Sequence, residues 1–125
     1  MILKAISLHQ PWANMIADGE KTIETRCWST SHRGELLICS TRKRVFDHAG
    51  QLCKTLGCAV ALVNLVDCRP MTTADEARAA CAYYDGAWAW VLENIRRIVP
   101  FPVRGRHRLY DADVTNTVRF DEVGP

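Results

Sequence analysis

The chain has 125 residues, of which 48% are hydrophobic and 24% are charged, and its formal net charge is +2. These values are typical of a globular domain and exclude a disordered, collagen-like or low-complexity chain. The length predicts one domain over residues 1–125, without a linker. A net charge this small also excludes a protein that is held to nucleic acid by overall charge alone.

No apolar run approaches the roughly 20 residues that a membrane-spanning helix requires, and residues 1–12 lack the features of a signal peptide. We therefore expect a cytoplasmic protein without membrane contact. The six cysteines form no Cys-x-x-Cys pair, and no histidine lies at a zinc-finger distance from them. This spacing predicts free, mostly buried thiols, with no metal and no other cofactor. The sequence does not specify an oligomeric state.

The first part of the chain predicts one helix among short strands. Pro11 occupies the first position of a helix over about 11–18, and Gly19 follows at its C-terminal stop. Segments with strand-like alternation or β-branched residues flank this helix. The strands predicted here are residues 1–8, 21–26 and 35–41.

Two further helices are predicted, over about 44–56 and about 74–84. The first shows apolar residues at helical spacing and ends at Gly57, whereas Thr73 and Glu76 have the spacing of a capping box at the start of the second. The remaining strands are predicted at 58–68, at 87–99 and, as one short strand, within 107–120. Two prolines in the segment PFPVRG are expected to exclude a central strand there, and the last five residues are expected to be frayed.

These elements amount to five or six strands and about three helices, with no internal repeat. Strands and helices do not alternate regularly along the chain. The pattern therefore favours an α+β fold over a doubly wound parallel sheet.

The reactive side chains concentrate in residues 7–28, SLHQPWANMIADGEKTIETRCW. A His-Gln-Pro-Trp turn begins at His9, and a Gly-x-Lys-x-x-Glu-x-Arg run follows the predicted helix. On a regular strand Lys21 and Glu24 point to opposite faces, so they meet only if the start of the strand bends or bulges. If they meet, Glu24 can accept a hydrogen bond from an exocyclic amine of a base, while Lys21 or Arg26 donates to a carbonyl or a phosphate.

The run ISLHQPWANMIADGEKTIETRCWSTSHRGELLICST closely resembles the opening of the ASCH domain. The resemblance continues through GCAVALVNLVDC and, more loosely, through WAWVLENIRRIVPFPVRG, so it covers about residues 5–110. It implies a small stand-alone, prokaryotic-type ASCH protein with a PUA-like mixed β-barrel and helices at its flanks. It also implies a partner such as RNA, a modified nucleoside or a transcription factor. Some small relatives resemble amidohydrolases that deacylate acetylcytidine, and a ribonuclease activity is associated with others.

The chain departs from the amidohydrolase pattern at one position. Lys21 matches that enzyme, but Glu24 stands where the resemblance places its nucleophilic threonine. A carboxylate does not replace an alkoxide nucleophile, so we place recognition ahead of catalysis. In the alternative, a metal-independent hydrolase acts on acylated cytidine or RNA, with Lys21 as charge stabiliser and Glu24 as general base. The candidates for a second acidic residue are Asp75, Glu76 and Asp85.

The main hypothesis is a basic cleft that binds RNA, another single-stranded nucleic acid or a modified nucleoside. Lys21, Glu24 and Arg26 supply polar recognition in this cleft. The other predicted ligand-binding residues are His9, Gln10, Trp12, Trp28, Arg33, Arg42, Lys43 and Arg44.

Some of these assignments stay open at this point. Trp12 has the spacing of a core residue relative to Met15 and Ile16, so core packing is favoured over base stacking. Trp28 fits either role, and His9 is equally a ligand-facing donor or a turn residue. The basic clusters form a phosphate-tracking rim if the fold gathers them, and are scattered surface charges otherwise. They are His32–Arg33, Arg42–Arg44 and Arg104–Arg108.

Overall fold

The computed structural model describes residues 1–114 and 118–121. Strands dominate this part of the chain, and the helices are short. The elements are β1 (Ile2–Leu8), α1 (Trp12–Ala17), β2 (Ile23–Arg26), β3 (Gly34–Ser40), β4 (Cys58–Pro70), the 3-10 helix η1 (Thr73–Asp75), α2 (Glu76–Ala79), β5 (Trp88–Pro102) and β6 (Tyr110–Asp113).

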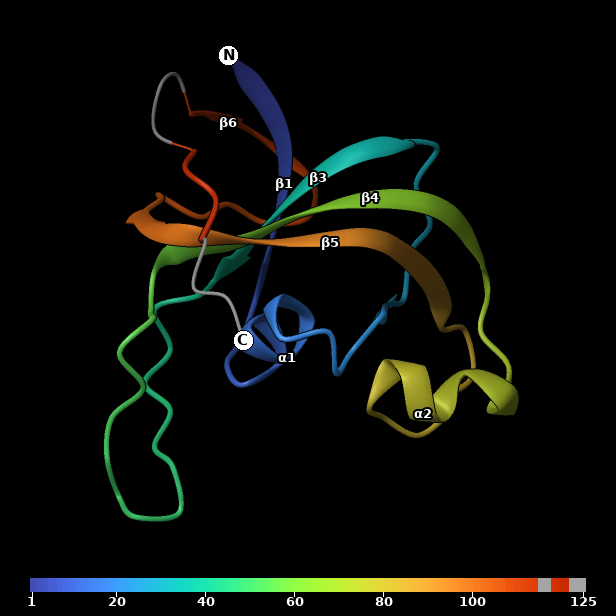
Figure 1. Cartoon of the computed structure of the whole chain (residues 1–125). Coiled ribbons are helices and arrows are strands. Elements are labelled where there is room, and N and C mark those ends of the chain that lie inside the picture. Colours follow the sequence, from blue (N-terminus) through green and yellow to red (C-terminus); the bar gives the residue numbers. More distant parts are fainter. Residues whose placement is uncertain (115–117, 122–125) are drawn as a thin grey trace.

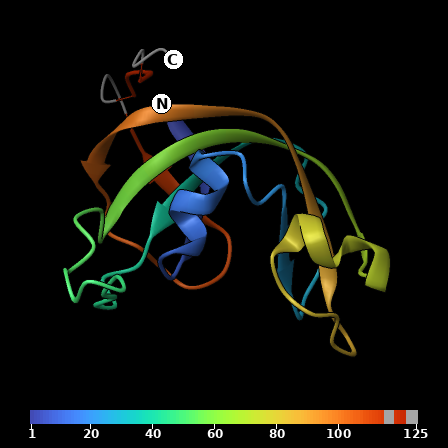
Figure 2. The same ribbon diagram turned by 60° about the horizontal axis from the view of Figure 1, so that its bottom comes forward.

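The six strands form one mixed sheet in the order β2-β5-β4-β3-β1-β6. Only β1 and β3 run parallel among the described pairs, and the others are antiparallel. The long strands β4 and β5 arch over α1 (Figures 1 and 2), and three register shifts between them supply the bends that this curvature requires. In the described residues β2 and β6 remain edges, so the sheet is barrel-like but open. The predicted α+β, mixed-barrel architecture is confirmed at this level.

The main core lies between the arch of the sheet and α1. The helix buries Ala13, Ile16 and Ala17 against it. Trp12 is instead 42% exposed, so the prediction that it packs in the core is wrong. The buried stripe of this six-residue helix begins one residue later than the sequence spacing suggested. Trp90, in contrast, is fully buried on β5.

Two predicted helices differ from the structure. Residues 44–56 form no helix, because Asp47 organises a turn: its Oδ1 accepts hydrogen bonds from the amides of Ala49 and Gln51. Phe46 then pairs with Leu52 across this turn. The predicted helix over 74–84 is shortened to η1 and α2, because Ala80 adopts a left-handed conformation with φ of 54° and ends α2.

The capping box at this point is also shifted by one residue from the prediction. Thr72 and Asp75 form it, rather than Thr73 and Glu76. The Asp75 carboxylate accepts a hydrogen bond from the Thr72 amide and a bidentate pair from Arg69 at 2.7 and 2.9 Å. The hydrogen bond from Arg69, followed by that from Thr72, lowers the pKa of Asp75 well below its ordinary value.

β5 continues to Pro102, so the expected end of this strand at about residue 99 is wrong, but its prolines do not lie in a centrally paired part of the sheet. Pro102 pairs with Cys58 of β4 on one side. On the other side, β2 pairs only with residues Trp88 to Val91 of β5. Pro100 and Pro102 therefore have no β2 residue beside them that would need the N–H group that a proline lacks. The short C-terminal strand is confirmed as β6, whereas four of the last five residues lie outside the described part of the chain.

The six cysteines are free thiols, as predicted, but the expectation that most of them are buried is wrong. Cys39 and Cys58 are buried, Cys27 is exposed, and the other three are partly buried. Burial raises the pKa of Cys39 to about 12 and also raises the pKa of Cys58, so both thiols stay protonated near neutral pH. None of the helices in the described residues has the length and apolar character that crossing a membrane requires.

Candidate functional site

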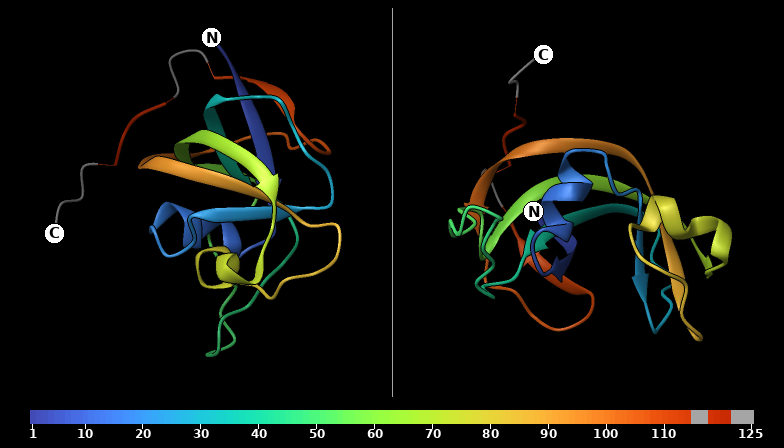
Figure 3. Two further views of the ribbon diagram at one scale, coloured as in Figure 1. Left: turned by 90° about the vertical axis from the view of Figure 1, so that its right-hand side faces the viewer. Right: turned by 90° about the horizontal axis from the view of Figure 1, so that it is seen from below.

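A pocket of about 880 Å³ opens where the C-terminal ends of the parallel strands β1 and β3 approach β2. The start of α1, the segment after α2 and the loop between β5 and β6 complete its wall. The view from below in Figure 3 shows these segments beneath the arch of the sheet. The lining residues are Ser7, Leu8, His9, Trp12, Lys21, Glu24, Thr25, Arg26, Ser40, Thr41, Arg42, Gly57, Cys81, Ala82, Tyr84, Val103, Arg104, Gly105, Arg106, His107 and Arg108.

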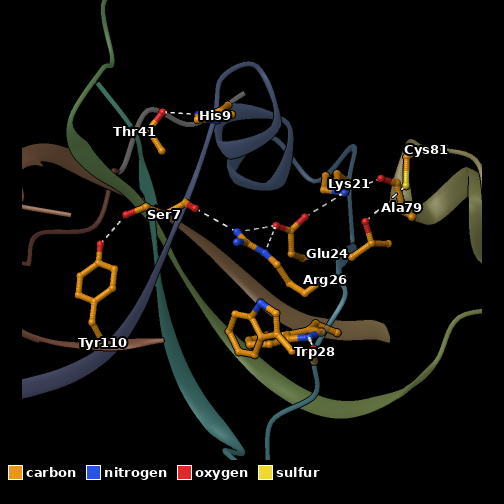
Figure 4. Close-up of polar contacts among 12 residues, drawn as sticks. Ser7, His9, Lys21, Glu24, Arg26, Trp28, Thr41, Ala79, Cys81 and Tyr110 are labelled. Carbon is orange, nitrogen blue, oxygen red and sulfur yellow. Dashed lines mark hydrogen bonds and ion pairs between the residues drawn. The ribbon is translucent and has the colours of Figure 1, made fainter. Parts of the chain in front are cut away.

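Lys21 and Glu24 meet in this pocket, with Lys21 Nζ 3.4 Å from Glu24 Oε1 (Figure 4). The bend that the sequence required is present, since β2 begins only at Ile23. Before it, Gly19 adopts a φ of +80°, and the Lys21 amide donates to the carbonyl of Met15 rather than to a strand. This turn swings Lys21 onto the same side as Glu24.

The carboxylate of Glu24 is shared between two cations. Arg26 Nε donates to Glu24 Oε2 at 2.9 Å, while Lys21 lies at Oε1. Lys21 also donates to the carbonyl of Ala79, and Arg26 Nη2 donates to the carbonyl of Ser7 at 3.0 Å. Lys21 is 2% exposed and Glu24 8%, and such burial is compatible with charge only when each group is paired. The trio carries a net positive charge.

Ser7 fixes the loop that closes the opposite wall. Its hydroxyl is 2.6 Å from the phenol oxygen of Tyr110, and burial raises the pKa of this phenol, which therefore stays protonated. Gly105 packs directly over Ser7: a Cβ at position 105 would lie 2.9 Å from Ser7 Oγ. Only glycine permits this approach, which brings the basic residues 104–108 to the pocket.

The rim of the pocket is rich in cations that have no acidic partner. Within residues 1–114 and 118–121, the side chains of Arg42, Arg104 and Arg106 make no ion pair. Glu24 is the one carboxylate among the described lining residues. Elsewhere on the surface, many cations are neutralised by ion pairs. Those are Lys4, Arg33, Arg69, Arg96 and Arg97.

Two exposed aromatic side chains border the pocket. Trp12 lies at the start of α1 and is 42% exposed, and Tyr84 follows α2 and is 40% exposed. Trp28 lies outside the pocket wall. The guanidinium of Arg108 covers its ring at 4.1 Å from the centroid, and Trp28 itself meets Trp90 edge to face at 4.9 Å.

The structure thus brings together only part of the predicted set. His9, Trp12, Lys21, Glu24, Arg26 and Arg42 line the pocket, whereas Gln10, Trp28, Arg33, Lys43 and Arg44 do not. Gln10 is buried, and its amide Nε2 donates to Asn14 and to both oxygens of Thr55. Arg33 instead donates to the carbonyls of Thr30 and His32.

The second acidic residues that the sequence offered lie elsewhere. Asp75 binds Arg69, Glu76 accepts a hydrogen bond from the Tyr83 amide, and Asp85 accepts one from the Tyr83 hydroxyl. None of the three lines the pocket. The lining residues absent from the predicted site, such as Ser7, Thr41 and Tyr84, carry no local motif. Only the sheet topology could have placed them here.

The chain is similar to known proteins both in sequence and in fold. Mouse and human proteins named activating signal cointegrator 1 are each 28% identical to the chain over 127 aligned positions, which cover 86% of the chain. The chain spans 22% of the length of these relatives. The crystal structure of ASCH from Zymomonas mobilis superposes with a TM-score of 0.61 at 19% identity, covering 79% of the chain and 72% of that structure. A mutant form of the same Zymomonas mobilis protein superposes with a TM-score of 0.57 at 17% identity, covering 79% of the chain and 74% of the mutant.

The family assignment rests on most of the chain. Residues 6–102 match the ASCH domain family, and this range includes the last three residues of β1 and all of β2, β3, β4 and β5. The superposition with the solved ASCH structures shows that the chain shares their fold. The chain belongs to the ASCH domain family.

Proposed function

We propose that the pocket binds single-stranded RNA, with one unpaired base, ordinary or modified, inside it and the flanking phosphates on its rim. The ASCH family is PUA-like and is associated with RNA binding, which supports this choice. The pocket of about 880 Å³, which is large enough to hold a base, and its polar wall give the proposal a physical basis in this chain.

The unpaired rim cations are the single observation that carries the proposal. Surface cations with no acidic neighbour create a positive potential that attracts a polyanion. Arg42 packs against Gly57, whose carbonyl accepts a hydrogen bond from the Val103 amide, so Arg42 lies next to the loop that carries Arg104 and Arg106. Phosphates that flank a bound nucleotide would meet these side chains without displacing an existing ion pair.

The interior of the pocket suits a base better than a phosphate. Trp12 and Tyr84 present aromatic faces for stacking. The Arg26 guanidinium and the Lys21 ammonium are donors, and Glu24 is an acceptor, so the wall can pair with the polar edge of a base. A double-stranded helix does not offer an unstacked base to such a cavity.

Fluorescence anisotropy with a labelled single-stranded RNA of about 8 nucleotides tests the proposal. We expect tighter binding of this RNA than of the same sequence in a duplex. Trp12→Ala should weaken binding by about 1–3 kcal/mol, the usual contribution of base stacking on an aromatic ring, and Trp12→Phe should retain most of it. Equal affinity for the two RNA forms, or no effect of Trp12→Ala, would contradict the proposal.

Arg106→Gln and Arg33→Gln form a matched pair for the rim. Both arginines are exposed, but only Arg106 lines the pocket. The first substitution should weaken RNA binding, and the second should leave it unchanged. Equal effects of the two would assign the binding to general surface charge.

Hydrolysis of acylated cytidine or RNA is a second candidate, favoured by the buried Lys21 ammonium 3.4 Å from Glu24 at the wall of a pocket large enough for a nucleoside. In this reaction Glu24 would activate a water as general base, and Lys21 would stabilise the developing oxyanion. Chromatography of N-acetylated cytidine and short RNAs after incubation with the protein tests it. Turnover that Glu24→Gln abolishes would support hydrolysis, and intact substrates after long incubation would exclude it for those compounds.

A further inference from the structure

Residues 42–56 form an exposed extension that we call the basic loop. It projects from the end of β3 and returns to the start of β4, well away from the body of the sheet (Figures 1 and 2). Phe46 is 53% exposed and Leu52 40% exposed at its paired segment. About half of the surface of Phe46 is therefore open to a partner.

The basic loop is also strongly cationic. Its side chains include Arg42, Lys43, Arg44 and Lys54, and none of these makes an ion pair within the described residues. Asp47 is the one acidic residue in the loop, and its Oδ1 is occupied by the amides of Ala49 and Gln51. The loop therefore presents cations that the rest of the domain does not neutralise.

Phe46 lies among these charges rather than beneath other apolar groups. The guanidinium of Arg44 is 5.6 Å from its ring centroid. A planar ring beside a guanidinium offers stacking and a phosphate contact at the same place, which is the combination that single-stranded nucleic-acid surfaces use.

Polar contacts, most of them partly buried, tie the base of the loop to the pocket. The Thr55 carbonyl accepts hydrogen bonds from Gln10 and from Ser40, and its hydroxyl accepts one from Asn14. At the other side, His9 Nδ1 is 2.6 Å from Thr41 Oγ1, where both residues line the pocket. These contacts explain why Gln10 is buried, and they connect the His-Gln-Pro-Trp turn to the basic loop.

We propose that the basic loop is a second RNA-contact surface, which stacks a base on Phe46 and binds phosphates of the strand as it leaves the pocket past Arg42. This inference rests on the proposed RNA-binding function and extends it to a longer segment of RNA. Arg42 belongs to both surfaces, so the path from the pocket to Lys43 and Arg44 is continuous along the chain. The unneutralised charge around Phe46 favours a polyanion over an apolar protein partner.

The test compares fluorescence anisotropy with two labelled single-stranded RNAs, of roughly 4 and roughly 12 nucleotides. The short RNA fills the pocket and its rim, and the long one can also reach the loop. Phe46→Ala should weaken binding of the long RNA by about 5- to 150-fold, which is the effect of losing one stacked base. Binding of the short RNA should not change. Phe46→Trp should keep the wild-type affinity for the long RNA, because it keeps an aromatic ring. Phe46→Leu keeps an apolar partner for Leu52 but should lose affinity as Phe46→Ala does.

Lys43→Gln/Arg44→Gln tests the phosphate contacts, and neither residue lines the pocket. For the long RNA, this variant should reduce the slope of log affinity against log salt concentration by about 0.7 per lost contact. Lys4→Gln/Arg119→Gln removes the same charge from surface positions outside the pocket, and we expect no change from this control.

Each outcome separates the two proposals. Unchanged affinity of the long RNA in Phe46→Ala would overturn the role of the loop, and would leave the loop as a contact for another class of partner, while the pocket proposal stands. Equal effects of Phe46→Leu and Phe46→Trp would exclude stacking as the mechanism. No affinity of the wild-type protein for either RNA would overturn both proposals.

Discussion

The Lys21 ammonium lies 3.4 Å from the Glu24 carboxylate, although a regular strand would point the two side chains to opposite faces. The turn before β2 produces the contact, and Arg26 holds the second carboxylate oxygen at 2.9 Å. The pair forms the buried end of the pocket. Each member stabilises the charge of the other, because both side chains are nearly buried.

Lys21→Met should therefore destabilise the domain by about 1–3 kcal/mol, because it removes one of the two cations that compensate the nearly buried Glu24 carboxylate, while Arg26 still holds the other oxygen. Glu24→Gln should also lower the free energy of unfolding. The double variant should lose less stability than the sum of the two single losses, by about 0.5–3 kcal/mol, because it removes the ammonium and the carboxylate of the pair together. Urea unfolding of the four proteins measures this coupling, and strictly additive losses would contradict it.

Tyr84→Ala and Tyr83→Ala offer a matched comparison for stacking. The two neighbouring tyrosines are 40% and 41% exposed, but only Tyr84 lines the pocket. Tyr84→Ala should weaken binding of a single-stranded RNA by about 1–3 kcal/mol, while Tyr83→Ala should have little effect. An RNA titration of both variants checks this, and the reverse order would move the site away from the pocket.

Gly105→Ala should disturb the loop that carries the rim cations. The added Cβ would lie 2.9 Å from Ser7 Oγ, so either the loop or Ser7 must move. We expect a stability loss of about 1–3 kcal/mol and weaker RNA binding. In the Ser7→Ala background the clash with Oγ is absent, so the added loss from Gly105→Ala should be smaller. An unchanged loss in that background would show that the contact with Ser7 is not the cause.

Asp75→Asn should make stability less dependent on pH. The Arg69 hydrogen bond lowers the pKa of Asp75 in the folded protein, so its ionised form adds stability above the unfolded value of about 3.9. This contribution is lost as the pH falls through the lower, folded pKa. At neutral pH the variant should be less stable by about 1–2 kcal/mol, and the difference should shrink on acidification. Urea unfolding at neutral and acidic pH measures it, and a constant difference would contradict the assignment.

The sequence predicted the strands better than the helices, for physical reasons. The apolar, β-branched residues 58–68 fit only a buried strand, and β4 is there. In contrast, the apolar positions of residues 44–56 had helical spacing, but the turn around Asp47 and the contacts of Thr55 determine the loop. Side-chain hydrogen bonds of this kind compete with a helix and are invisible to periodicity.

The candidate site was predictable only where its residues share a local motif. Lys21, Glu24 and Arg26 lie within one short run, so the spacing pointed to them directly. Trp12, which was among the predicted ligand-binding residues, lines the pocket, but its favoured role in the core was wrong. The loop at 103–108 reaches the pocket through the Ser7–Tyr110 contact, which joins residues 103 positions apart in sequence.

The central claim is that unpaired cations around the pocket bind the phosphates of single-stranded RNA. The most direct measurement is the affinity of a labelled RNA of about 8 nucleotides over a range of salt concentrations, for the wild type and for Arg104→Gln/Arg106→Gln. We expect log affinity of the wild type to fall linearly with log salt concentration, and the slope of the variant to be smaller by about 1.4, or about 0.7 for each lost phosphate contact. Affinity that does not depend on salt, or an identical slope in the variant, would contradict the claim.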